Sequence, residues 1–132
     1  MELSDKVRAF LEAPRFAVLA TLNANGTAQQ STMWFELQDD SIMMNTAAGR
    51  KKVANMERDP RVSLCIPDGY SYVTLRGRVE LNPDREQGQQ DIARLAVRYH
   101  GPEKAQEFIP DYRKQHRISI RMTVEQVAAH GI

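Results

Sequence analysis

Hydrophobic and polar residues alternate with a period of two along much of this chain. Segments 16–22, 27–37, 41–46, 61–66 and 70–81 carry this alternation or an unbroken apolar run, and 117–122 repeats it. Such patterns are typical of strands, and Asn25-Gly26 between the first two segments is a tight-turn sequence. We therefore predict six strands joined mostly by antiparallel hairpins.

Four other segments show helical spacing. Ser4 can cap a helix over 5–12 that ends before Pro14, and Asn82-Pro83-Asp84 can start one over 84–99. Shorter helices are predicted over 50–58 and 103–109. The predicted fold class is mainly β with flanking helices, with the six strands closed into an antiparallel barrel that leaves no free edge.

Composition narrows the class of protein. With 132 residues, 42% of them hydrophobic, the chain suits one domain spanning 1–132. Its 18 Lys and Arg nearly balance 17 Asp and Glu, which argues against nucleic acid as the main partner. Cys65 is the only cysteine, and no apolar run is long enough to span a membrane. We expect a cytoplasmic protein with no membrane partner.

Three consecutive cations stand out against this balanced background. Arg50, Lys51 and Lys52 fall in the first turn of the predicted helix 50–58. The helix N-terminus is already positive, so local electrostatics disfavours cations there. Local conflicts of this kind are expected mainly at functional sites, and cations beside free N–H groups suit a phosphate. The alternative is a solvated basic turn.

The same region carries a family resemblance. The sequence Asn45-Thr46, then Arg50-Lys51-Lys52, then Arg58-Asp59-Pro60-Arg61 resembles the pyridoxamine 5′-phosphate oxidase-like split β-barrel superfamily over residues 14–124. The resemblance implies an FMN-binding type of split barrel. It matches Thr46, Lys51 and Lys52 to a threonine, an arginine and a lysine that hold the flavin phosphate and ribityl chain, with Arg50 in place of a serine. It implies a cofactor site comprising Ser31, Thr32, Met33, Trp34, Asn45, Thr46, Ala47, Arg50, Lys51 and Lys52.

Within the superfamily, the chain most resembles the short proteins that use the deazaflavin coenzyme F420. The segment 16–22, Gly26, the Arg50-x-Lys52 spacing and the Asp59-Pro60-Arg61 break carry this resemblance. The second strand lacks a flavin-contacting arginine, and 112–117 lacks the substrate signature of the vitamin oxidases. Extra cations suit the glutamate tail of F420. The resemblance implies an F420H2-dependent oxidoreductase that reduces an unsaturated small molecule and binds its cofactor as a homodimer.

Several alternatives stay open at this stage. FMN is the alternative cofactor, in which case the protein is an FMN-dependent oxidoreductase of the same superfamily. A non-catalytic cofactor carrier or a haem-binding split barrel would share the fold. A nucleic-acid module would use Arg76, Arg78 and Arg121, and Met33 with Trp34 could simply pack inside the barrel.

The chain offers no strong candidates for catalysis by its own side chains. It has no nucleophile motif, so catalytic residues are left unassigned, with Tyr70 or Tyr72 as possible proton donors. His100, His116 and His130 lack the spacing of a metal site, and no metal is predicted. Hydride chemistry would belong to the cofactor.

Overall fold

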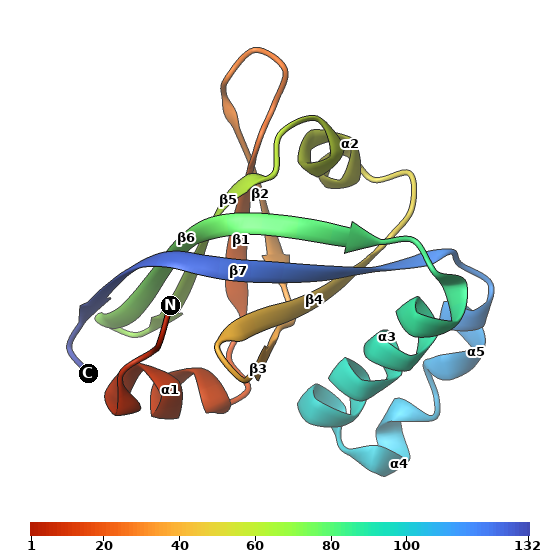
Figure 1. The fold of residues 1–132 in the computed structure, drawn as a ribbon. Coiled ribbons are helices and arrows are strands. Elements are labelled where there is room, and N and C mark those ends of the chain that lie inside the picture. Colours follow the sequence, from red (N-terminus) through yellow and green to blue (C-terminus); the bar gives the residue numbers. More distant parts are fainter.

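The computed structural model describes all residues from 1 to 132 and is mainly β with flanking helices. The chain runs in the order α1 (Asp5–Glu12), β1 (Ala17–Leu22), β2 (Ala28–Met33), β3 (Glu36–Gln38), β4 (Ser41–Ala47), α2 (Lys51–Arg58), β5 (Arg61–Asp68), β6 (Ser71–Asn82), α3 (Arg85–His100), α4 (Pro102–Ala105), α5 (Ile109–Arg113) and β7 (Arg117–His130). Figure 1 shows a strongly curled sheet with α3, α4 and α5 grouped together and α2 apart from them. None of these helices is long and apolar enough to cross a bilayer.

The prediction of six strands in a closed barrel was wrong in its strand number and its closure. One antiparallel sheet of seven strands has the order β2-β1-β5-β6-β7-β4-β3, so β2 and β3 are its two edges. These edges are the two halves of the segment predicted as one strand over 27–37. Only Trp34 and Phe35 separate them in sequence. The chain therefore leaves β1 at Met33 and joins β4 at Glu36.

Helix α3 explains why the strand splits at this point. The Tyr99 hydroxyl accepts a hydrogen bond from the Phe35 amide at 3.1 Å, and Arg98 Nε donates to the Phe35 carbonyl at 2.9 Å. Side chains of α3 thus satisfy backbone groups that a continuous strand would pair with a neighbour. The sheet curls almost into a barrel, but its edges are joined by covalent chain instead of a ladder.

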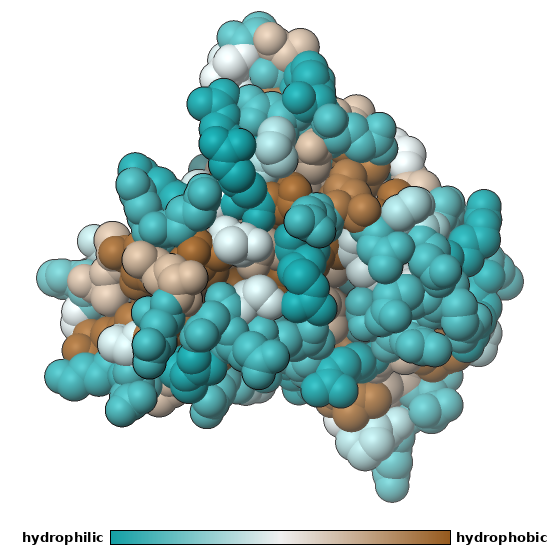
Figure 2. Space-filling model, viewed as in Figure 1, coloured by the Kyte–Doolittle hydropathy of each residue, from teal (hydrophilic) through white to brown (hydrophobic).

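The core lies inside this curled sheet. It contains 20 buried residues, including Leu19, Phe35, Leu64 and Leu75 and, from α1, Val7, Phe10 and Leu11. Ser4 caps α1 through its hydroxyl, as predicted. The opposite strand faces point outward, and the face seen in Figure 2 is mostly hydrophilic, with small apolar patches.

Two further segments differ from prediction near the C-terminus. The helix predicted over 103–109 is two short helices, α4 and α5, with turns between them and Pro110 in the first turn of α5. The strand predicted over 117–122 continues to His130. Pairing with β6 supports this extension, and an irregularity between Arg76 and Gly77 disrupts the alternation that would have revealed it.

Candidate functional site

The end of β4 and the start of α2 form one side of a pocket of about 240 Å³. The end of β2, the middle of α3, α5 and the start of β7 complete it. Its position follows from the register, since Ala47 at the end of β4 lies opposite Arg117 at the start of β7. Elements far apart in the sequence therefore contribute to one concave surface.

The N-terminus of α2 gives this site a positive potential that favours anions. Arg50 is the N-cap residue but provides no side-chain cap, while its carbonyl accepts the Val53 amide at 3.0 Å. The first amides of a helix have no intrahelical acceptor, and the helix dipole makes that end positive. This arrangement favours a negatively charged group in front of Lys51 and Lys52.

Three cations line the pocket without a neutralising carboxylate. Arg50 is exposed, whereas Lys52 and Arg117 are half-buried. None of the seven ion pairs in the protein involves any of them. An anion in the pocket would therefore be the first counter-charge that they meet.

Burial and the neighbouring positive charges lower the pKa values of two of these cations, Lys52 and Arg117. Burial lowers the pKa of Lys52, and the positive charges of Arg50 and Arg117 lower it further. Burial also lowers the pKa of Arg117; the nearby Tyr112 opposes this shift and Arg50 adds to it. The shifts show that the pocket disfavours its own positive charge, which a bound anion would stabilise.

Asn45 holds Arg117, the third cation of the pocket, in place. Its Nδ2 donates to the Gly88 carbonyl at 2.9 Å, so its Oδ1 faces Arg117 and accepts from Nε at 2.9 Å. Arg117 also donates to Gln115 Oε1 at 2.9 Å. A Cβ at position 88 would lie 2.0 Å from the Arg117 carbonyl oxygen, so only glycine lets α3 approach β7 this closely.

Two aromatic side chains, Trp34 and Tyr112, line the pocket beside the cations. The Trp34 ring stacks on Tyr99 with centroids 5.0 Å apart and meets the edge of His100 at 5.1 Å. The Arg117 guanidinium lies over the Tyr112 ring at 5.4 Å, and burial raises the pKa of Tyr112. The pocket thus combines a cationic end with flat apolar surfaces suited to a ring.

Eight of the ten residues predicted for a cofactor site line this pocket. They are Thr32, Met33, Trp34, Asn45, Thr46, Ala47, Arg50 and Lys52. The other two, Ser31 and Lys51, do not line it. Ser31 is partly buried on β2, opposite Leu19 of β1, while Lys51 is exposed on α2. The ribityl and phosphate role predicted for Lys51 has no support from this geometry.

Sequence reasoning missed four lining residues. Ile92 and Leu95 belong to the apolar stripe of α3, whose direction of packing was not predictable. Tyr112 and Arg117 were noted only as lacking the oxidase substrate signature. The one available signal was a cation, Arg117, at the start of a strand in which Ile118 and Ile120 are apolar.

The remaining candidates lie elsewhere. Tyr70 and Tyr72 do not line the pocket; Tyr70 is 97% exposed at a turn and Tyr72 stacks on His130. His116 Nε2 is 2.7 Å from the Pro83 carbonyl oxygen. No three metal-ligating side chains gather at one point in the structure.

The curled open sheet carries a helix N-terminus and three cations beside the gap between its edges, an arrangement that suits a bound anion. The chain belongs to the pyridoxamine 5′-phosphate oxidase family, whose sequence profile matches residues 3–131. The family predicted from the sequence is thereby confirmed.

Individual relatives narrow the comparison. The chain is 29% identical over 102 residues to an F420H2-dependent biliverdin reductase of Mycobacterium tuberculosis, covering 76% of this chain and 74% of the relative. A solved F420 reductase superimposes with a TM-score of 0.79 at 25% identity, covering 96% of this chain and 98% of the other. A conserved hypothetical protein of Mycobacterium tuberculosis superimposes with a TM-score of 0.81 at 25% identity, covering 96% of this chain and 84% of the other.

Proposed function

We propose that this protein is an F420H2-dependent reductase that transfers a hydride from the deazaflavin to an unsaturated small molecule. The observation that carries the proposal is a pocket with three cations that form no ion pair, Arg50 and Lys52 at the start of α2 and Arg117 at the start of β7, together with Trp34. The names of the relatives support F420 as the cofactor and reduction as the reaction.

The residues of the pocket fit such a cofactor. Lys52 and the first amides of α2 suit its phosphate, and Arg50 at the rim suits the carboxylates that follow the phosphate in F420. Thr46 is buried at the end of β4 and supplies a hydroxyl close to the same helix. The aromatic surface of Trp34 suits the ring system.

When bound, F420H2 supplies the hydride, and the chain supplies binding and orientation. Arg117, held by Asn45, keeps positive charge inside a half-buried pocket, where it is screened less than at the surface. Ile92, Leu95 and Met33 exclude water from one side of the pocket. No side chain of the pocket is placed as a nucleophile, in agreement with a reaction carried by the cofactor.

The cofactor can be tested directly, because Trp34 is the only tryptophan and lines the pocket. Titration with F420 should quench its fluorescence with saturation, and FMN should bind at least tenfold more weakly. FMN bound more tightly than F420 would instead leave an FMN-dependent oxidoreductase. Saturable F420 binding with no oxidation of F420H2 by quinones, enones or tetrapyrroles would favour a non-catalytic carrier.

We infer that the protein acts as a homodimer through the outer face of the sheet. Register places Val18, Cys65, Thr74 and Ala128 in one row across β1, β5, β6 and β7. All four side chains are small or neutral, and none is buried. On β2 the row continues to Thr32, which lines the cation pocket, so a partner seated on it would add a wall to the cofactor site.

A further inference from the structure

A reductase of the kind proposed above needs a proton as well as a hydride. Hydride addition to one carbon of a conjugated C=C bond leaves an enolate or a related anion, and a proton must then complete the reduction. A positioned side chain typically speeds such a proton transfer by about 10²–10⁴-fold. Which side chain supplies the proton follows from the lining of the cofactor pocket, provided that the protein is this reductase.

The pocket holds few groups that can give up a proton. Its lining residues include no carboxyl group, imidazole or thiol. Arginine stays protonated, and Lys52 contacts the phosphate in the proposed binding mode. Thr32 and Thr46 carry alcohols, which are weaker acids than a phenol. Tyr112 is therefore the general acid that the lining of the pocket favours.

The other tyrosines are placed for different roles. The Tyr99 hydroxyl already donates to the Arg15 carbonyl at 2.6 Å. Tyr70 and Tyr72 lie outside the pocket. No hydrogen bond within the chain engages the Tyr112 hydroxyl, so its proton is free for a bound substrate.

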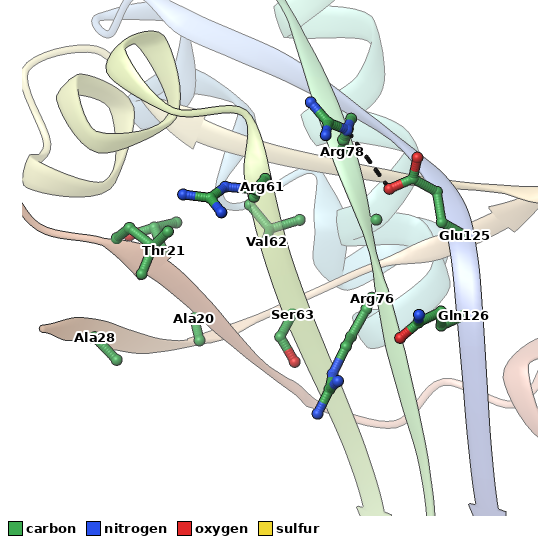
Figure 3. Close-up of a pocket in the computed structure, with 12 residues that line it drawn as sticks. Ala20, Thr21, Ala28, Arg61, Val62, Ser63, Arg76, Arg78, Glu125 and Gln126 are labelled. Atoms are coloured by element: carbon green, nitrogen blue, oxygen red, sulfur yellow. Dashed lines mark ion pairs between the residues drawn. The ribbon is translucent and has the colours of Figure 1, made fainter. Parts of the chain in front are cut away.

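The larger hollow on the outer face of the sheet offers no competing acid. It measures about 540 Å³, shares no residue with the cofactor pocket and lies where the proposed second copy would cover it. Figure 3 shows its one carboxylate, Glu125, joined to Arg78. Within the chain, the proton must come from the lining of the cofactor pocket itself.

Arg117 lies where it can stabilise an ionised Tyr112. Its guanidinium carbon is 5.4 Å from the centroid of the Tyr112 ring, and Asn45 holds it through Nε. Burial raises the pKa of Tyr112, which keeps the phenol protonated at neutral pH, and the charge of Arg117 opposes that rise. The same charge would stabilise the phenolate that remains after proton transfer.

We propose that Tyr112 is the proton donor of the reduction and that Arg117 is the counter-charge of its phenolate. The hydride adds to one carbon of the substrate double bond, and the electron pair of that bond moves toward the conjugated carbonyl group. The O–H bond of Tyr112 then breaks, and its proton joins the second carbon. The substrate is reduced and F420H2 is oxidised; the second proton of F420H2 goes to water, and water returns a proton to Tyr112.

Tyr112→Phe tests the donor because it keeps the ring and removes only the hydroxyl. Tyr70→Phe makes the same change at a side chain that is 97% exposed. Titration with F420, followed by Trp34 fluorescence, should give the parent affinity for both variants. At saturating F420H2, reduction of menadione and of 2-methylcyclohexenone should be about 100-fold or more slower in Tyr112→Phe and unchanged in Tyr70→Phe.

The stereochemistry of the product separates proton donation from a structural role. The proton creates the stereocentre of 2-methylcyclohexanone, so the parent protein should enrich one enantiomer. Tyr112→Phe should lose that enrichment, because water then supplies the proton.

Ionisation of Tyr112 gives a readout that needs no cofactor. The ultraviolet absorbance of tyrosinate, compared between the parent and Tyr112→Phe, isolates this side chain, and its pKa should lie above the ordinary value of 10.0. Arg117→Gln should move the titration to still higher pH, because it removes the charge that opposes the rise. Arg113→Gln, the same change at an exposed neighbour, should move it less.

Four results would overturn the proposal. These are parent rates in Tyr112→Phe, an equal loss of rate in Tyr70→Phe, unchanged enantiomer enrichment in Tyr112→Phe, or a titration that Arg117→Gln does not move. Parent rates in Tyr112→Phe would remove only the donor and leave the reductase, with the proton coming from water, Lys52 or the second copy. A parent protein that binds F420 but reduces neither acceptor would contradict the reductase, and the donor with it.

Discussion

Lys52 is half-buried, lies near two other cations and stands in the first turn of α2. Its Nζ lies 3.4 Å from the Met33 sulfur, and no carboxylate reaches it. The neighbouring Lys51 has the same chemistry but is exposed and lies outside the pocket. The two lysines therefore form a matched pair for separating a binding role from general charge.

Lys52→Ala is expected to weaken F420 binding by about 1.5–3 kcal/mol, the range for a hydrogen bond to a charged group. Lys51→Ala should change the affinity by much less. Fluorescence titration of Trp34 measures both, and thermal unfolding verifies that both variants are folded. Equal losses in the two variants would assign the effect to overall charge and not to a direct contact.

The lowered pKa of Lys52 predicts a pH dependence. Affinity for F420 should fall as the pH rises through the Lys52 pKa, which lies below the ordinary value of 10.5. Lys52→Arg keeps its charge and should lack this loss. The stability of the free protein should change in the opposite direction. Between the lowered pKa of Lys52 in the folded protein and 10.5, the unfolded chain binds the extra proton, so the free energy of unfolding rises with pH. Titration and urea unfolding across this range test both signs.

At the scale of elements, the split between β2 and β3 depends on α3. The Tyr99 hydroxyl accepts from the Phe35 amide and donates to the Arg15 carbonyl at 2.6 Å, while Arg98 donates to carbonyls at the end of α1. One helix thereby ties together α1, the start of β1 and the gap between the sheet edges.

Tyr99→Phe should lower the free energy of unfolding by about 1–3 kcal/mol, because the Phe35 amide loses its acceptor in a buried place. Tyr70→Phe makes the same chemical change at a side chain that is 97% exposed and should have almost no effect. Urea unfolding of both variants provides the comparison. A Tyr99→Phe protein as stable as Tyr70→Phe would show that the split does not depend on this hydroxyl.

At the scale of the whole molecule, the proposed homodimer predicts a mass of about 30 kDa by light scattering, twice the 15.0 kDa of the chain. Thr74→Arg would place a charge in the middle of the neutral row Val18, Cys65, Thr74 and Ala128, and should shift the mass toward that of a monomer. Glu80→Arg, on the same strand but outside the row, is the control. A parent protein of 15 kDa at micromolar concentration would contradict the homodimer.

The sequence by itself determined the local elements and eight of the twelve residues that line the site. Alternation, turn residues and caps are local signals, so β1, β4, β6 and α3 were placed within one or two residues. The cations at the start of α2 were visible because they are consecutive. The family motif added Thr46 and Lys52, since both lie in the same continuous stretch.

Only the tertiary structure decided which distant residues meet. Arg117 joins Lys52 because β7 pairs with β4, and Tyr112 joins them because α5 packs beside α3. The split at Trp34 and Phe35 depends on Tyr99, which is 64 residues from Phe35 along the chain. The β-bulge between β6 and β7 likewise arises from strand register. Contacts of this kind depend on packing between remote segments, which no local pattern of hydrophobic and polar residues encodes.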